Sequence, residues 1–132
     1  MMETLSVTSE NRVQLIDITN IISSFIREKG WENGAVILFV PHTTAGITIN
    51  EGADPAVQRD IAHTLSSLVP FRGEYRHAEG NSDAHIKTVL TGTSALVILK
   101  NGHLQLGTWQ SIFFCEYDGP RTRKIWIEHI GG

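Results

Sequence analysis

The sequence predicts a single α+β domain over residues 1–132, with a mixed or largely antiparallel β-sheet and about three helices on one of its faces. Stretches with strand-type alternation lie towards both ends of the chain, three stretches with helical spacing lie among them, and strands and helices do not alternate strictly. A chain of 132 residues, 41% hydrophobic and 19% charged, suits one globular domain with one core.

The first elements are predicted to be a hairpin and a helix. In "ETLSVTSENRVQLIDI" apolar residues alternate with polar ones on both sides of a polar turn at 9–11, which predicts two paired strands. Asp17 or Thr19 can then cap a helix whose isoleucines recur at helical spacing, and Gly30 is its predicted end.

Two strands are predicted next. "AVILFV", residues 35–40, is a continuous apolar run, which is typical of a strand covered on both faces, and Pro41 ends it. In residues 42–51, Ile47 and Ile49 alternate with polar residues, which predicts a half-buried strand.

The middle of the chain is predicted to hold two helices and a loop. Asp54-Pro55 provides a cap and a first helical residue, and apolar residues follow at helical spacing up to Leu68. Residues 70–82 are polar and lack a period, so they predict a long loop of the kind that often carries function. A short third helix fits "NSDAHIKTVLTG", with Gly92 as its end.

The C-terminal third is predicted to be mostly strands. "ALVILKNGHLQL" predicts a hairpin around Asn101-Gly102, and two long strands flank the turn at 118–120. The single cysteine, Cys115, lies in an apolar run and is predicted to be a buried thiol.

Composition also excludes several classes of function. The net charge is −3 and no Lys/Arg run exceeds two residues, so the chain lacks the basic footprint of a nucleic-acid-binding protein. No apolar stretch approaches the roughly 18 residues of a membrane span, and the N-terminus does not resemble a signal peptide. We therefore expect a cytoplasmic protein with neither nucleic acid nor membrane as partner.

Three histidines border polar loops or helix starts: His42, His77 and His85. Catalytic zinc or iron sites often use three protein ligands, and imidazoles are common among them. Neither a His-Glu-x-x-His pair nor a Cys-x-x-Cys pair is present, so spacing alone leaves a metal site and ordinary hydrogen-bonded histidines both open.

A phosphate site is a second hypothesis from the residues. Gly80-Asn81-Ser82 opens a predicted helix, and Thr43, Thr44, Lys87 and Arg121 could add donors. Asp83 beside that terminus would repel an anion unless a metal bridged the two or the carboxylate were protonated. This combination favours metal-assisted chemistry on a phosphorylated substrate.

Three motifs resemble those of the YjbQ-like family, often labelled secondary thiamine-phosphate synthases: "PHTTAGITINEGADPAV", "GNSDAHIKTVLTG" and "LGTWQSIFFCEYDGPRTRKI". The resemblance extends over nearly the whole chain. It implies a YjbQ-like fold that assembles as a homotrimer, with the polar residues of the motifs meeting in a pocket near subunit contacts.

The resemblance also implies roles, which we combine with those expected from the residues. A divalent metal ion, zinc or iron, would be held by His42, His77 and His85. The catalytic candidates are Glu51, Asp83 and Arg121. The substrate-binding candidates are Thr43, Thr44, Asn50, Asn81, Lys87, Trp109 and Gln110.

The activity that the resemblance implies is thiamine-phosphate synthesis from hydroxymethylpyrimidine diphosphate and thiazole phosphate. Arg121, Lys87 or a metal would stabilise the departing pyrophosphate, and Trp109 could stack on a ring or pack as an ordinary core aromatic. Two other functions stay open. One is a non-catalytic trimeric protein that binds a small ligand or metal, and the other is a metal-dependent phosphoester hydrolase.

Overall fold

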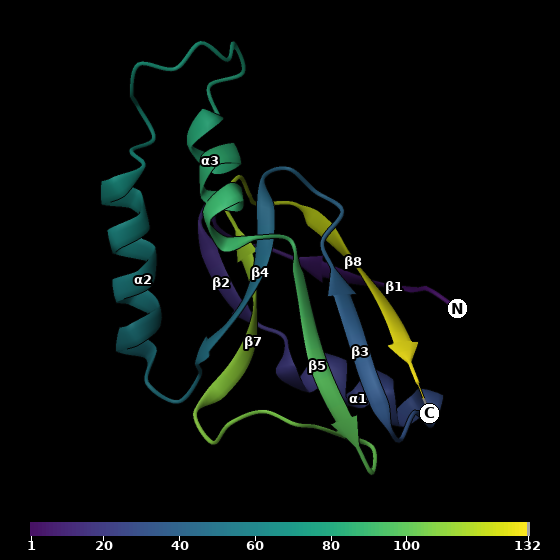
Figure 1. Ribbon diagram of the computed structural model, residues 1–132. Coiled ribbons are helices and arrows are strands. Elements are labelled where there is room, and N and C mark those ends of the chain that lie inside the picture. Colours follow the sequence, from purple (N-terminus) through teal and green to yellow (C-terminus); the bar gives the residue numbers. More distant parts are fainter. Residues whose placement is uncertain (132) are drawn as a thin grey trace.

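Two antiparallel sheets and three helices make up the protein in the computed structural model, which describes residues 1–131 (Figure 1). The elements are β1 (Glu3–Thr8), β2 (Gln14–Asp17), α1 (Thr19–Lys29), β3 (Gly34–Phe39), β4 (Ala45–Glu51), α2 (Pro55–Leu68), α3 (Ser82–Thr91), β5 (Ser94–Lys100), β6 (His103–Leu104), β7 (Gln110–Glu116) and β8 (Thr122–Ile130). The predicted α+β class and order of elements are confirmed.

The strands divide into a five-stranded sheet, in the order β1-β8-β3-β5-β6, and a three-stranded sheet, in the order β2-β7-β4. The predicted hairpin of the first two strands is wrong, because β1 pairs with β8 and β2 pairs with β7. The segment between β1 and β2 instead crosses from one sheet to the other. The backbone N–H of Ser9 donates to the carbonyl of Arg121 at 2.9 Å, which ties that crossing to the start of β8.

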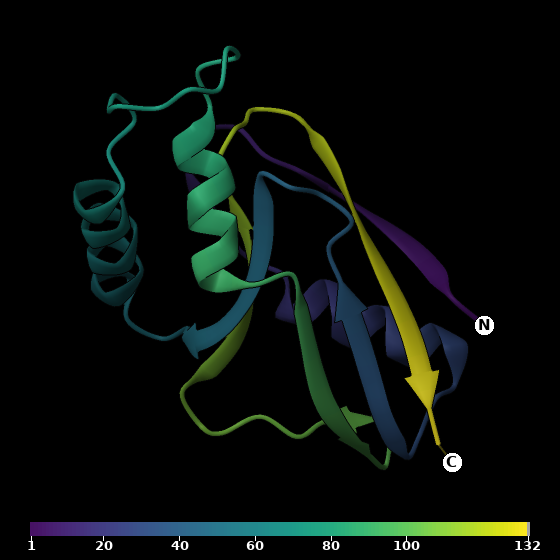
Figure 2. The same ribbon diagram turned by 45° about the horizontal axis from the view of Figure 1, so that its top comes forward.

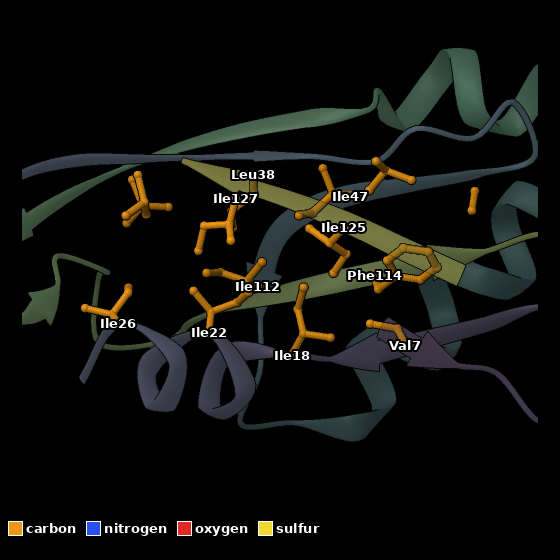
Figure 3. Close-up of a cluster of buried hydrophobic side chains, with 14 of the residues drawn as sticks. Val7, Ile18, Ile22, Ile26, Leu38, Ile47, Ile112, Phe114, Ile125 and Ile127 are labelled. Atoms are coloured by element: carbon orange, nitrogen blue, oxygen red, sulfur yellow. The ribbon is translucent and has the colours of Figure 1, made fainter. Parts of the chain in front are cut away.

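The main core lies between the two sheets and α1 (Figure 3). Ile18 at the start of α1, with Ile22 and Ile26 one and two turns further on, is fully buried and belongs to the same cluster as side chains of β3, β7 and β8. Gly30 ends α1 with a φ of 69°, a left-handed conformation that glycine adopts readily, as predicted.

A second cluster covers the other face of the three-stranded sheet. It joins Phe113, Cys115 and Tyr117 of the β7 region to Ala84 of α3, with Leu65 of α2 packed against it. Strand β7 is therefore covered on both faces, by α1 on one side and by α2 and α3 on the other. The prediction that the helices share one face is wrong. Cys115 is buried as predicted, and burial raises the pKa of its thiol to about 12.

Strand β3 is not covered on both faces in the single chain, contrary to the prediction. Val36 and Leu38 point into the core and are 0% exposed, whereas Phe39 is 39% exposed. On the neighbouring strand β5, Leu96 and Ile98 are 66% and 65% exposed. The outer face of the five-stranded sheet is therefore apolar and open.

The local end signals of other elements are confirmed. Asp54 caps α2 by accepting a hydrogen bond from the backbone N–H of Ala56 at 2.9 Å. Asn101 and Gly102 have φ values of 51° and 78° and join β5 to β6 as a hairpin. The polar segment 69–81 forms the predicted loop, which extends beyond the ends of α2 and α3 (Figure 2). Among residues 1–131, no helix combines the length and apolar content needed to cross a membrane.

Candidate functional site

A hollow of about 500 Å³ lies where the end of β3, the β3–β4 loop and the start of β8 meet. Val40 holds this corner by donating its backbone N–H to the carbonyl of Thr93 at 2.8 Å, just before β5. The polar residues of the wall come from these segments: His42, Thr43, Thr44, Thr93, Arg121 and Arg123. Cations, hydroxyls and an imidazole thus surround one space.

Arg123 lines this hollow from a buried position and is fixed by hydrogen bonds to its neighbours. It is 2% exposed, and its guanidinium donates to the carboxylate of Glu116 and, at 2.8 Å, to the hydroxyl of Thr44. Burial raises the pKa of Glu116, but the bonds from Arg123 and from the Ser9 hydroxyl outweigh it and leave that pKa below its ordinary value. Glu116 is therefore ionised at neutral pH, and the pair fixes the position of Thr44.

Arg121 is the more accessible cation of the hollow. Its side chain is 50% exposed, and it donates from Nε to the carbonyl of Asp118 at 3.0 Å and from Nη2 to that residue's carboxylate at 3.2 Å. A guanidinium carries five N–H donors, so these bonds position the group and leave donors for a ligand.

His42 is positioned by the backbone of β8. Its Nε2 accepts a hydrogen bond from the N–H of Lys124 at 3.0 Å. Burial lowers the pKa of this imidazole, and the nearby Arg123 and Arg121 lower it further, so the ring is neutral at pH 7. In a neutral ring whose Nε2 accepts, Nδ1 carries the proton and is a donor.

The structure brings the three predicted metal ligands into neighbouring positions. His42 and His85 line a second hollow of about 470 Å³, and the ring centroids of His77 and His85 are 5.3 Å apart in an edge-on arrangement. They do not complete a ligand set within one chain. Across residues 1–131 no three His, Cys, Asp or Glu side chains form a group able to hold a metal ion, and Lys124 already occupies the Nε2 of His42.

Asp83 and Lys87 lie inside the protein instead of in the hollow. Asp83 is 0% exposed and accepts two bonds of 3.0 Å from Arg12 and one of 3.4 Å from Lys87, which is itself 2% exposed. Burial raises the pKa of Asp83, but its two cationic partners outweigh burial and hold that pKa below its ordinary value. Both groups are charged and bonded to other protein groups, which leaves them poorly placed for the acid/base and substrate-binding roles expected of them.

Asn81 links this buried network to the hollow. Its Nδ2 donates to the carboxylate of Asp118 at 2.9 Å, and Asp118 also contacts Arg121 and lies 3.8 Å from Arg12. Asn81 therefore acts on the hollow through Asp118 and Arg121.

Four other predicted residues lie elsewhere. Glu51 and Asn50 are at the far end of β4, opposite Gln110 and Ser111 of β7, about 20 Å along the strand from the end that carries Thr44. Glu51 accepts from the N–H of Ala53 at 2.9 Å, and Gln110 accepts from the N–H of Gly107 at 2.8 Å. Within one chain, these two hydrogen bonds stabilise the turn that follows β4 and the turn that precedes β7.

Trp109 belongs to the same far end and is 64% exposed, so the reading of it as an ordinary core aromatic is wrong. Three residues that matter to the hollow had no signal strong enough to single them out: Arg12, Thr93 and Arg123. The alternation of Arg121 and Arg123 along an extended segment was the one usable hint, because residues two apart on a strand share a face.

Comparisons with known proteins all agree on the family. The family described as "UPF0047 protein YjbQ-like" matches residues 3–132. The UPF0047 protein MJ1081 of Methanocaldococcus jannaschii is 51% identical over 95% of this chain and 91% of its own length. The UPF0047 protein YugU of Bacillus subtilis is 48% identical over 99% of this chain and 100% of its own.

Solved structures agree as well. An uncharacterised YjbQ/UPF0047-family protein from Clostridium acetobutylicum superposes with a TM-score of 0.93 at 51% identity, covering 97% of this chain and 99% of that one. A hypothetical protein from Aeropyrum pernix gives a TM-score of 0.94 at 34% identity, covering 100% and 99%.

Proposed function

Since this chain belongs to the UPF0047 family of YjbQ-like proteins, a name that describes no activity, we propose a function from the site itself: an enzyme that acts on a phosphorylated small molecule. One observation carries the proposal. One hollow is lined by Arg121, by the neutral donor His42 and by the hydroxyls of Thr43 and Thr93. Its size suits a phosphoryl group together with part of the molecule that carries it.

The charges around the hollow favour an anion. Arg12, Lys87 and Arg121 form a connected set of ion pairs with only two carboxylates, Asp83 and Asp118. This set therefore carries one excess positive charge, at the end where Arg121 is exposed. Arg123 is a further cation beside the hollow, and Glu116 neutralises its charge. A phosphate ester, with one to two negative charges, matches that excess.

Thiamine-phosphate synthesis remains the named candidate activity. In that reaction the thiazole nitrogen attacks the pyrimidine methylene carbon, a C–N bond forms, and the C–O bond to the diphosphate breaks with its electron pair leaving on pyrophosphate. The nitrogen has no proton to lose, so the step needs cations at the leaving group more than a general base. Arg121 and the Nδ1–H of His42 would serve that need.

A non-catalytic role is the second candidate, and the state of Asp83 favours it. Its carboxylate, like the ammonium of Lys87, is buried and bonded to other protein groups, so neither is poised for acid/base catalysis. On this reading the chain would bind a phosphorylated ligand and release it unchanged.

Zinc or iron remains a prediction and plays no part in the proposed step, because the three histidines do not form a complete site in one chain. His77 and His85 are the pair whose rings adjoin and would contribute most. Metal analysis of the purified protein, beside His77→Ala and His85→Ala, tests the prediction directly. A metal content that both variants leave unchanged would contradict it.

The homotrimer is proposed as the functional assembly, with the open face of the five-stranded sheet as its contact. On that face Ile37 lies opposite Leu96, and the rings of Phe39 and Trp126 stack at 5.7 Å. A continuous apolar face that is exposed in the single chain commonly marks a protein interface.

Calorimetric titration with inorganic phosphate and with thiamine monophosphate tests the proposed function. We expect both to bind, and Arg121→Gln to weaken both by about tenfold, a typical loss for one charge-assisted contact. The matched control is Arg59→Gln, an exposed arginine on α2, which should bind like the unaltered protein. Equal affinities in the two variants would refute the site.

Turnover separates the two candidates. Incubation with hydroxymethylpyrimidine diphosphate and thiazole phosphate should release pyrophosphate if the chain is a synthase. Binding of thiamine monophosphate without any pyrophosphate release would support the non-catalytic role, whereas phosphate release from simple esters would indicate a hydrolase.

A further inference from the structure

The five-stranded sheet ends at β1, and one side of that strand is unpaired. Within residues 1–131, β1 pairs with β8 over all six of its residues and with no strand on its other side (Figure 2). Proteins usually protect such an edge with lysine, proline, a bulge or a very short strand. Glu3–Thr8 contains neither lysine nor proline, and its register with β8 is unbroken. Its outward backbone N–H and C=O groups are therefore open to a further strand.

A hollow of about 440 Å³ lies beside this edge, between β1 and α1. Leu5 of β1 and Ile21 and Phe25 of α1 form its apolar wall, and Ile21 is 44% exposed. Asn20 and Ser24 add neutral groups that can form hydrogen bonds. Side chains of a strand alternate between the two faces of a sheet, so every second side chain of a strand added to β1 would point towards this β1–α1 hollow, as Leu5 does.

Glu28 gives the β1–α1 hollow its charge. Among the residues of 1–131 that line the hollow it is the one ionisable side chain, and it is exposed. Across the described chain it forms no ion pair. Its neighbour Lys29 pairs with Glu3 at 2.7 Å, so those two residues add no net charge. The hollow is therefore an apolar surface that ends at one uncompensated carboxylate.

These features fit a lysine or arginine side chain. Both side chains pack an apolar stem against apolar surface and keep the charged head at its polar end. The stem would lie along Ile21 and Phe25, with the head at the carboxylate of Glu28. A second copy of this chain fits less well, because the one charged residue of its own β1 is Glu3, which Glu28 would repel.

We propose that this edge binds an extended basic segment of a partner protein, which pairs with β1 as a sixth strand and places a lysine or arginine in the β1–α1 hollow. Backbone hydrogen bonds to β1 would supply the affinity common to all sequences, and the hollow would supply the preference for a basic side chain. This hollow shares no residue with the one beside Arg121, so the inference goes beyond the proposed function.

Fluorescence anisotropy with two labelled peptides tests the proposal. Each capped peptide has seven residues, with lysine or glutamate at the centre, threonine on either side of it and valine two residues away. We expect the lysine peptide to bind about tenfold more tightly than the glutamate peptide. Glu28→Gln should remove most of this preference. Glu32→Gln, an exposed carboxylate just beyond α1 that does not line the hollow, is the matched control and should keep it.

A second variant tests the hollow by its shape. Ser24→Phe adds a ring at an exposed position of α1, so folding is preserved while the hollow is filled. It should weaken the lysine peptide about tenfold. Arg27→Phe, at an exposed position of the same helix outside the hollow, is its control and should not weaken the peptide.

Hydrogen exchange with mass spectrometry tests the strand pairing. Saturation with the lysine peptide should slow amide exchange in residues 3–8 and leave α2 unchanged. Unchanged exchange in residues 3–8 would refute strand addition.

The remaining outcomes are also decisive. Equal affinities of the two peptides, a preference that survives Glu28→Gln, or no binding at all would refute the basic segment. A particle mass that falls in Ser24→Phe without any peptide would assign the edge to a second copy instead. Each of these results leaves phosphate binding beside Arg121 to its own test.

Discussion

Asp83 is the residue on which the structure departs furthest from a catalytic interpretation, because it is an interior ion-pair partner of Arg12 and Lys87. Asp83→Ala would leave Lys87, 2% exposed, without its carboxylate. We expect the free energy of unfolding to fall by about 3–5 kcal/mol, the usual cost of an uncompensated buried charge. Urea denaturation measures this.

The control for this prediction is Asp60→Ala, on the exposed side of α2, which should stay within about 0.5 kcal/mol of the unaltered protein. Equal stability of the two variants would show that the buried network contributes nothing.

The two buried carboxylates also determine how stability depends on pH. Asp83 and Glu116 have pKa values below their ordinary 3.8 and 4.5 in the folded chain, so the unfolded chain takes up protons first as the pH falls. Their contribution is therefore fully present above about pH 5 and is lost progressively below about pH 4.

Thermal unfolding followed by circular dichroism between pH 3 and pH 7 checks this expectation. The loss at low pH should be smaller in Glu116→Gln than in Glu79→Gln, whose carboxylate is 75% exposed in the unaltered protein. Identical pH profiles for the two variants would contradict the conclusion that the buried carboxylate of Glu116 contributes to the loss of stability at low pH.

Among the helices, α2 is the least attached to the core, because α1 and α3 each contain buried side chains and Pro55–Leu68 contains none, although Asp54 caps the helix. Loss of the cap should therefore open this helix locally without unfolding the sheets. For Asp54→Ala we expect amide exchange in residues 57–68 to rise about fivefold, the equivalent of about 1 kcal/mol for one cap. Hydrogen exchange with mass spectrometry resolves this, and β7 should keep its protection. Equal acceleration in β7 would show that α2 unfolds only with the whole domain.

Local sequence patterns predicted where helices, strands and turns occur far better than they predicted which strands pair with one another. The Asp54-Pro55 cap, the glycine end of α1 and the Asn101-Gly102 turn depend on a few adjacent residues, so the sequence was sufficient for them. Strand alternation says which residues share a face but not which strand lies alongside. The pairing of β1 with β8, more than a hundred residues apart, could therefore not be predicted from the sequence pattern.

The same limit applies to the site. His42, His77 and His85 were singled out by the polar segments they occupy, and the fold does bring them near one another. That Asp83 and Lys87 would be occupied by each other and by Arg12 could not be read from spacing, because Arg12 lies 71 residues away along the chain.

For the molecule as a whole, the open apolar sheet face predicts assembly. Leu96→Lys combined with Ile98→Lys would place two charges on that face, and we expect the proposed homotrimer to dissociate to monomers. Light scattering coupled to size exclusion measures the mass of the particle. Ile21→Lys, on the exposed side of α1 at 44% exposure, is the control and should remain trimeric. A double variant of unchanged mass would place the contact elsewhere.

Cys115 has a practical consequence for following ligand binding. It is the one cysteine of the sequence, it is 0% exposed, and the high pKa of its thiol leaves almost no thiolate to react at neutral pH. A cysteine introduced by Val89→Cys would then be the single point at which a maleimide dye attaches. Fluorescence from that position, beside His42 and His85, would report in real time when a ligand fills the second hollow, with no background from the native thiol.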